Sequence, residues 1–181
     1  HEFRRKRRPY VLLWLVGFVF WLSALHWLRL PHWATSFGWI ALSFYFAFYL
    51  PVFIGLSRIA VHRLRVPLIL AAPVVWTGLE LARAHLLTGF TMASLGHTQY
   101  RWIELIQISD LAGAFGVSFV VMLAAACLAR MAPLEGSRWT FWPLAPMAAV
   151  LTAVLVYGNQ RTSFPPPKPV ARIALIQGSI D

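Results

Sequence analysis

A glutamate and an arginine stand inside an otherwise apolar run, VPLILAAPVVWTGLELARAHLL, at residues 66–87. Glu80 and Arg83 are three residues apart, so a helix places them on one face, and Trp76 precedes them on the same stripe. An arginine in this position has the donor geometry to bind a phosphate or a carboxylate. The stripe therefore predicts a cavity for a charged headgroup. An ion pair that pins the helix to the next loop is an alternative that stays open.

The stretch TGFTMASLGHTQYRWIELIQISDLAGAFGVSF, Thr88 to Phe119, is neither apolar enough to cross a membrane nor polar enough to be a loose loop. Its glycines indicate turns or close backbone approach, and IELIQISDL is typical of a short amphipathic helix that lies along an interface. We expect residues 88–113 to form a rim that binds an amphiphile. The predicted substrate-binding residues are Trp76, Glu80, Arg83, Gly89, Phe90, Gly96, His97, Gln99, Gln107 and Asp110.

The remaining reactive side chains do not suggest further chemistry. Cys127 is the chain's one cysteine, which excludes an intrachain disulfide and a multi-cysteine metal site. It lies in the apolar run VVMLAAACLAR, where a thiol packs as a small hydrophobe and resists ionisation. His26 and His32 lack a third ligand at a suitable spacing for a metal. We therefore expect no metal site and no cofactor.

Composition predicts an integral membrane protein. Of the 181 residues, 59% are hydrophobic and 12% are charged, whereas soluble domains have about 45–50% apolar and about 25% charged residues. The net charge of +10 would suggest nucleic acid for a soluble protein. Here the basic residues cluster between apolar segments, so membrane topology and anionic lipid headgroups explain them better. We expect membrane lipids as partners and no nucleic acid.

Five segments are long enough, or nearly so, to cross a bilayer as helices, which takes about 20 mostly apolar residues. The predicted fold class is thus an all-α polytopic membrane helix bundle over residues 1–158. The five predicted spans are Pro9 to Leu30, Ser36 to Ile59, Val66 to Leu87, Ala114 to Met131 and Trp139 to Gly158.

Basic residues predict the sidedness of these spans. One set of connections holds ten of the 16 Lys and Arg residues and the other set holds six. The positive-inside tendency then places the N-terminus in the cytoplasm. With five spans, the C-terminus and the rim at 88–113 would both lie outside.

The pattern changes after Gly158. Residues 159–169, NQRTSFPPPKP, are predicted to be a proline-rich linker. Residues 170–181 contain ARIALIQGSI, which favours the first strand of an α/β domain. We expect both ends to be truncated, because RRKRR leads directly into a span and the strand pattern stops at Asp181.

Three stretches resemble the bacterial apolipoprotein N-acyltransferases: WTGLELARAHLLTGFTMASLGHTQ, ELIQISDLAGAFGVSF and ARIALIQGSI. The resemblance implies a membrane bundle in the bacterial cytoplasmic membrane, followed by a nitrilase-like domain on the extracytoplasmic side. It also implies that residues 170–181 begin that domain. The family usually has Gly-Phe-Pro-Trp where this chain has Gly89-Phe90-Thr91-Met92, so this loop lacks a rigid turn and a large ring.

The resemblance implies an activity as well. A phospholipid donates an acyl chain to an enzyme cysteine, and the N-terminal amine of a diacylglyceryl-cysteine lipoprotein then accepts it. In nitrilase-like domains, Glu, Lys and Cys act as base, oxyanion stabiliser and nucleophile. None of the three can be placed in this chain, so we expect no catalytic residue here and an inactive fragment that binds substrate.

Two alternatives from other classes remain open. In a membrane transporter or lipid channel, Glu80 and Arg83 would belong to a permeation path, with polar residues along several spans or a repeated half. The other spans have almost no polar residues at mid-depth. A structural anchor for an unrelated domain would need neither a buried Glu80 nor a glycine-rich rim.

Overall fold

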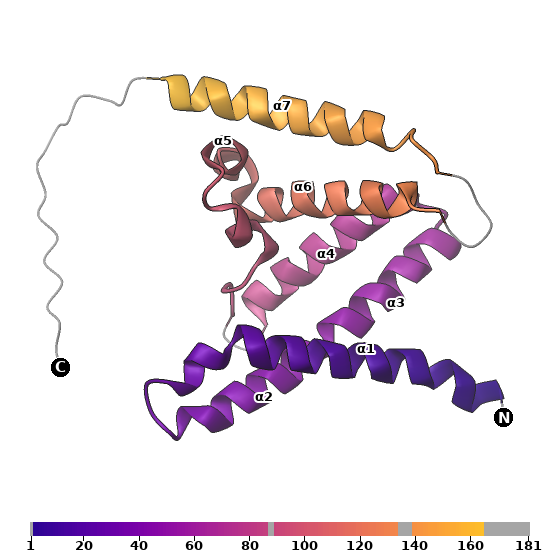
Figure 1. Cartoon of the computed structure of the whole chain (residues 1–181), viewed down its shortest axis with the longest axis vertical. Helices are drawn as coiled ribbons and strands as arrows, with labels where there is room; N and C mark the ends of the chain where they lie inside the picture. The colour runs from indigo at the N-terminus through magenta and orange to yellow at the C-terminus, as the bar shows by residue number, and fades with distance from the viewer. Residues whose placement is uncertain (1, 87–88, 134–138, 165–181) are drawn as a thin grey trace, which may run out of the picture.

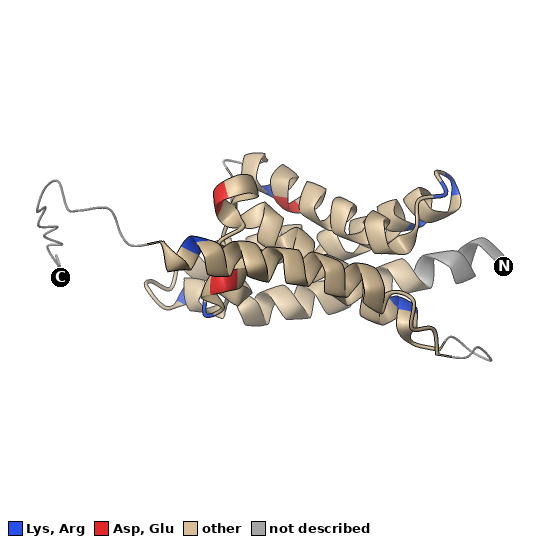
Figure 2. Cartoon of the chain, turned by 90° about the horizontal axis from the view of Figure 1, so that it is seen from above, with Lys and Arg blue, Asp and Glu red and all other residues tan. Residues whose placement is uncertain are grey.

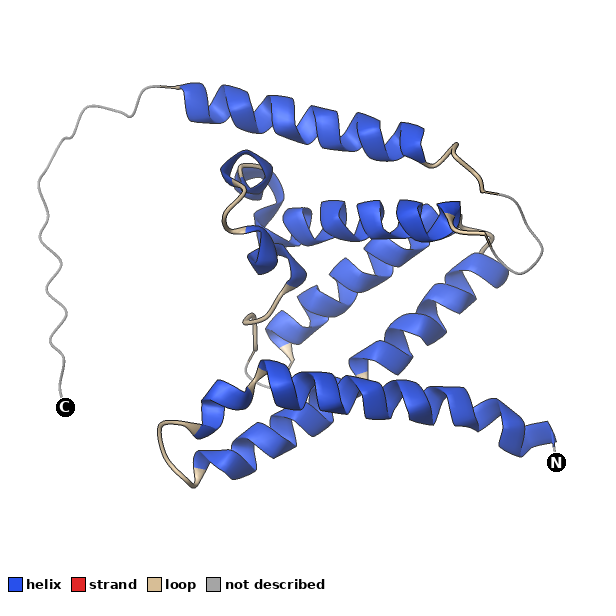
Figure 3. Ribbon diagram, in the orientation of Figure 1, coloured by secondary structure: helices blue, strands red, loops and turns tan. Residues whose placement is uncertain are grey.

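The computed structural model describes residues 2–86, 89–133 and 139–164, and these residues form helices and loops without a strand (Figure 3). The all-α expectation is confirmed for this part of the chain. Thr88 of the predicted rim, residues 165–169 of the predicted linker and the predicted strand at 170–181 lie outside the described residues. In chain order the helices are α1 (Glu2–Ala24), η1 (His26–Arg29), α2 (Thr35–Ala47), α3 (Tyr49–His62), α4 (Leu68–His85), η2 (Leu95–Gln99), α5 (Ile103–Ile106), α6 (Ser109–Met131) and α7 (Leu144–Ser163).

Each of the five predicted spans contains helix, but its ends and continuity differ from the prediction. The first helix stops at Ala24 and the chain continues as the 3-10 helix η1. The second span is divided at Phe48 into α2 and α3. Pro51 accounts for this break, because a proline cannot donate a hydrogen bond to the carbonyl four residues earlier, and its ring clashes with that carbonyl.

The fourth predicted span agrees with the structure, and the fifth is shifted. α6 begins at Ser109, but non-helical backbone at Ala112 and Gly113, where Gly113 has φ of 61°, separates its first turn from the helix that continues to Met131. α7 begins after Pro143, which occupies the N-cap position, and it continues to Ser163, past Gly158. The predicted interfacial helix is divided into the single turn of α5 and the turn that begins at Ser109, before the kink, and Asp110 belongs to this second turn.

Within the described ranges, two helical segments are long and apolar enough to cross a membrane by length and composition: Thr35–His62, which joins α2 and α3, and Ser109–Met131. The apolar part of α1, Pro9–Ala24, is shorter, and α4 contains Glu80 and Arg83. Large apolar side chains on the outer faces, such as Leu12, Val19 and Phe37, are exposed. This pattern is consistent with a protein that is surrounded by lipid.

Helices that are close in the sequence pack against one another as neighbours in the bundle (Figure 1). α1 packs against α2, α3 against α4, and α4 against α6, while α7 packs on α5 and α6. Three small apolar cores hold these pairs together. They consist of Trp21, Leu25 and Phe46 between α1 and α2; Phe53, Ala72 and Ala126 between α3, α4 and α6; and Leu105, Val120 and Val154 between α5, α6 and α7.

Charged residues gather at the ends of the helices, and the middle of the bundle is almost free of them (Figure 2). The acidic side chains that the structure describes all lie toward one end, where α4 stops and α6 starts. They are Glu80, Glu104 and Asp110. The opposite end, where α3 and α6 stop, carries arginines without an acidic residue among the described side chains.

Gly158 sets the distance between α7 and α5. This residue is buried, and a Cβ atom placed on it would overlap the main-chain carbonyl of Glu104. Backbone atoms cannot rotate away as a side chain can, so the two elements are in contact because residue 158 has no side chain.

We predict that Gly158→Ala lowers the free energy of unfolding by about 2 kcal/mol, the usual cost of overpacking a close contact. Gly38→Ala is the matched control, because a Cβ at Gly38 meets no atom within 4 Å. Thermal unfolding followed by circular dichroism checks both variants. Equal melting temperatures for the two variants would contradict the close contact.

Candidate functional site

Glu80 and Arg83 lie in the last two turns of α4, and each side chain is only 4% exposed. Their burial is unusual because an isolated charge removed from water costs several kcal/mol unless polar partners replace the water. Each side chain has one hydrogen-bond partner from the segment that follows α4: Ser94, in the loop before η2, binds Arg83, and Leu95, at the start of η2, binds Glu80.

The Glu80 carboxylate is bound through one oxygen. Its Oε1 accepts a hydrogen bond of 2.7 Å from the main-chain N–H of Leu95. The same oxygen accepts a second bond, of 3.1 Å, from the indole N–H of Trp76. Trp76 is one helical turn before Glu80, so α4 itself supplies a donor that orients the carboxylate toward the loop.

The Arg83 guanidinium combines a hydrogen bond with two aromatic contacts. Its Nη2 donates to Ser94 Oγ over 3.1 Å, and Ser94 Oγ in turn donates to the carbonyl of Thr91 over 2.8 Å. The guanidinium carbon lies 5.5 Å from the ring centroid of Trp21 and 5.4 Å from that of Phe46. Cation–π contacts at this range contribute about 0.5–2 kcal/mol each.

A third buried polar group holds the next residue of the loop. The main-chain N–H of Gly96 donates to Ser118 Oγ of α6 over 2.8 Å. A Cβ on Gly96 would lie 2.5 Å from the carbonyl oxygen of Ala114, so a larger residue could not lie this close to α6. Ser94, Leu95 and Gly96 are thus each bonded to a buried side chain of α4 or α6. We call these three residues the Ser94–Gly96 anchor.

Glu80 and Arg83 do not form an ion pair with each other. Within the described residues, the ion pair is instead that of Arg161 with Asp110, at 2.9 Å. Glu80 Oε2 and Arg83 Nε have no hydrogen-bond partner among the described residues, and a cavity of about 20 Å³ adjoins both side chains. That volume is sufficient for one water molecule. α4 is therefore pinned to its overlying loop by two separate bonds rather than by one salt bridge.

The structure brings several of the predicted site residues together. Trp76, Glu80, Arg83 and Gly96 belong to the anchor and its supports. The N–H of Phe90 donates to the carbonyl of Arg83 over 3.1 Å, and the Phe90 ring lies 5.0 Å from that of Phe46.

The side chains of the other predicted residues do not bond to this cluster. Gly89 forms the turn before Phe90, with φ of 81°. The His97 side chain is exposed, although its main-chain N–H donates to the carbonyl of Ser94 over 3.0 Å. The side-chain amide of Gln99 donates to Thr98. Gln107 follows α5. Asp110 bonds to Arg161 and to the hydroxyl of Tyr157 on α7. These side chains share the same end of the bundle with the anchor but make no recorded bond to it within the described residues.

Sequence reasoning missed the partners of the two charges. Trp21 and Phe46 gave no signal because each is one of many aromatic residues in apolar helices. Ser94 and Ser118 were equally hard to identify, although each is a serine among small or apolar residues near a glycine. The serine close to a glycine in the sequence ASLG could have indicated that a residue outside the long helices binds a buried charge.

An apolar cavity of about 270 Å³ lies next to the charged cluster. It shares Trp21, Tyr49 and Trp76 with the small cavity beside Glu80 and Arg83. The rest of its wall comes from Val16, Gly17, Phe20 and Leu50. The site therefore places an apolar recess beside fixed polar groups, an arrangement suited to an amphiphile.

The described residues contain no second group suited to chemistry. Cys127 is fully buried within α6. No three His, Cys, Asp or Glu side chains in the described ranges are close enough together to hold a metal ion.

Comparisons with known proteins agree with the resemblance in the sequence. The model of the apolipoprotein N-acyltransferase N-terminal domain matches residues 2–127. An apolipoprotein N-acyltransferase of Geobacter metallireducens is 35% identical over 97% of this chain and 36% of its own length. That of Rhodopirellula baltica is 41% identical over 64% of the chain and 22% of its own length. That of Bradyrhizobium diazoefficiens is 28% identical over 82% of the chain and 28% of its own length.

No solved structure matches the chain significantly. The chain spans between 22% and 36% of the length of these curated relatives. The matched residues 2–127 include α4, the Ser94–Gly96 anchor and most of α6. By this match, the chain belongs to the apolipoprotein N-acyltransferase family.

Proposed function

We propose that the chain is the membrane module of an apolipoprotein N-acyltransferase of the bacterial cytoplasmic membrane. It binds a phospholipid acyl donor and a diacylglyceryl lipoprotein acceptor at the extracytoplasmic side. The observation that carries this proposal is that Glu80 and Arg83, which bind the Ser94–Gly96 anchor, line a small cavity next to an apolar recess, in a region that matches the family. Both substrates are amphiphiles, so they require fixed polar groups at the edge of an apolar surface.

In this proposal Glu80 and Arg83 are positioning residues. Both are buried and bonded to the loop, so they act on substrate through the shape of the loop. Exposed side chains at the same end, including His97, are the ones that contact a headgroup.

The proposed reaction has two steps. A cysteine thiolate attacks the ester carbonyl of the phospholipid, which forms a thioester and releases a lysophospholipid. The lipoprotein amine then attacks the thioester, forms an amide and releases the thiol. Cys127 is unsuited to either step because it is buried in the interior of α6. In this proposal Cys127 is not the nucleophile, and the chain alone transfers no acyl group.

A transporter or lipid channel is the second function considered. A permeation path requires ionisable groups that face water. The burial of Glu80 and Arg83 and their bonds to the loop do not favour such a path.

Arg83→Gln in the longer protein that carries this chain is expected to lower the free energy of unfolding by about 2 kcal/mol, because a hydrogen bond and two cation–π contacts are lost. The rate of acyl transfer should fall together with the stability, because the loop loses its anchor.

His97→Ala should lower donor turnover without changing the melting temperature, with His26→Ala as the control for an exposed histidine. Unchanged turnover in both Arg83→Gln and His97→Ala would reject the proposed site.

Cys127→Ala in the same longer protein is expected to leave the acyl-transfer rate within about twofold of the original, because a thiol in an apolar site is a poor nucleophile. The rate is measured with phosphatidylethanolamine and a diacylglyceryl peptide. A complete loss of transfer at an unchanged melting temperature would place the chemistry at Cys127. Transfer by the 181-residue chain alone would also contradict the proposal.

A further inference from the structure

Two cavities flank the last turns of α3, at the end of the bundle opposite the Ser94–Gly96 anchor. The first, of about 840 Å³, lies between α1 and α3 and is lined by Pro9, Tyr10 and Arg58, among others. The second, of about 740 Å³, lies on the other side of α3 and reaches α4, α6 and Trp142. Arg58 and His62 line both cavities, so the last turn of α3 lies between the two cavities and contributes basic side chains to each.

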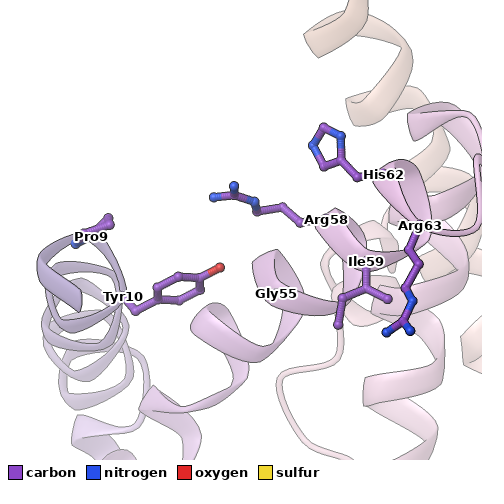
Figure 4. Close-up of a pocket in the computed structure, with 7 residues that line it drawn as sticks. All are labelled: Pro9, Tyr10, Gly55, Arg58, Ile59, His62 and Arg63. Carbon is purple, nitrogen blue, oxygen red and sulfur yellow. The ribbon is translucent and has the colours of Figure 1, made fainter. Parts of the chain in front are cut away.

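Figure 4 shows how the side chains of the first cavity lie. The guanidinium of Arg58 extends from α3 across the cavity, toward the side where Tyr10 of α1 lies. His62 is one turn further along α3 on the same side, and Arg63 points away. Arg58 is thus an exposed residue whose guanidinium is aimed into the first cavity, and it also lines the second.

The charge of this region is uncompensated in the part of the chain that the structure describes. Arg58 and Arg130 have no recorded hydrogen bond or ion pair there, and the acidic residues whose side chains are described lie toward the other end. Ser57, in the wall of the second cavity, is 6% exposed and its hydroxyl has no partner among the described residues. A buried hydroxyl and free guanidinium groups together suit the oxygens of a phosphate.

Apart from Arg58, Arg130 and Ser57, the wall of the second cavity is largely apolar. Ile54, Val61, Leu68 and Ile69 form it, and Trp142 lies with Arg130 in the same lining. An inorganic phosphate would leave this apolar surface in contact with water. A lipid acyl chain would cover it, and an indole ring is well suited to the level of the headgroups.

We propose that this end of the bundle binds one anionic phospholipid, with its phosphate at Arg58 and an acyl chain along the apolar wall of the second cavity. This site is separate from the acyl-transfer site. It rests on the membrane location proposed above but not on the reaction. The bound lipid would attach the basic ends of α3 and α6 to the leaflet next to them.

Native mass spectrometry of the 181-residue chain in nanodiscs tests the site. The nanodiscs contain phosphatidylcholine with or without phosphatidylglycerol. The chain is expected to retain phosphatidylglycerol over phosphatidylcholine, and Arg58→Gln should weaken this preference at least about tenfold, the effect of losing one direct hydrogen bond to a charged group. Arg65→Gln is the matched control, because Arg65 is exposed but lines neither cavity. It should retain the preference.

Equal losses in Arg58→Gln and Arg65→Gln would mean general surface attraction and would overturn the proposal. Displacement of the lipid by millimolar inorganic phosphate would also overturn it, in favour of a simple anion site. If Arg58→Gln does not fold, as judged by circular dichroism, Arg130→Gln takes its place with the same expectation. A chain that does not enter nanodiscs would contradict the membrane location itself. If the chain binds lipid as expected but the longer protein transfers no acyl group, only the proposed reaction is rejected.

Discussion

The bonds between three successive residues, Ser94 and the first two residues of η2, and buried side chains are the constraint on which the site depends. Ser94, Leu95 and Gly96 are held by Arg83, Glu80 and Ser118, which come from two different helices. The dependence is mutual. The charges can be buried because the loop supplies polar partners, and the loop has one position because the charges need those partners.

This constraint explains why the two ends of the bundle differ. At the anchor end, hydrogen bonds and aromatic contacts fix the chain close to α4 and α6, and little free charge remains inside. At the opposite end, Arg58 and Arg130 border open cavities and have no recorded partner among the described residues. The first end is suited to a defined shape, whereas the second is suited to an anionic ligand that supplies the missing charge.

The sequence predicted the helical segments and the charged stripe because both are strong local signals. Long apolar runs indicate helices whatever they pack against, and Glu80 and Arg83 are conspicuous within such a run. The partners were not predictable, because Ser94 and Ser118 are defined by contacts between residues far apart in the chain. The same reasoning grouped Asp110 with the site, although its carboxylate binds Arg161 and Tyr157 of α7. The division at Phe48 could have been predicted from Pro51, because a proline inside a helix removes a backbone bond.

The absence of a Glu80–Arg83 ion pair within the described residues is itself informative. Two opposite charges three residues apart on a helix can readily meet, and a direct pair would satisfy both without the loop. Here each charge binds a different loop residue, and the small cavity beside them leaves room for one water. An arginine is required for this arrangement, because its planar group can donate to Ser94 while it faces the rings of Trp21 and Phe46. The separation of the two charges is therefore what allows one helix to hold the loop at two points.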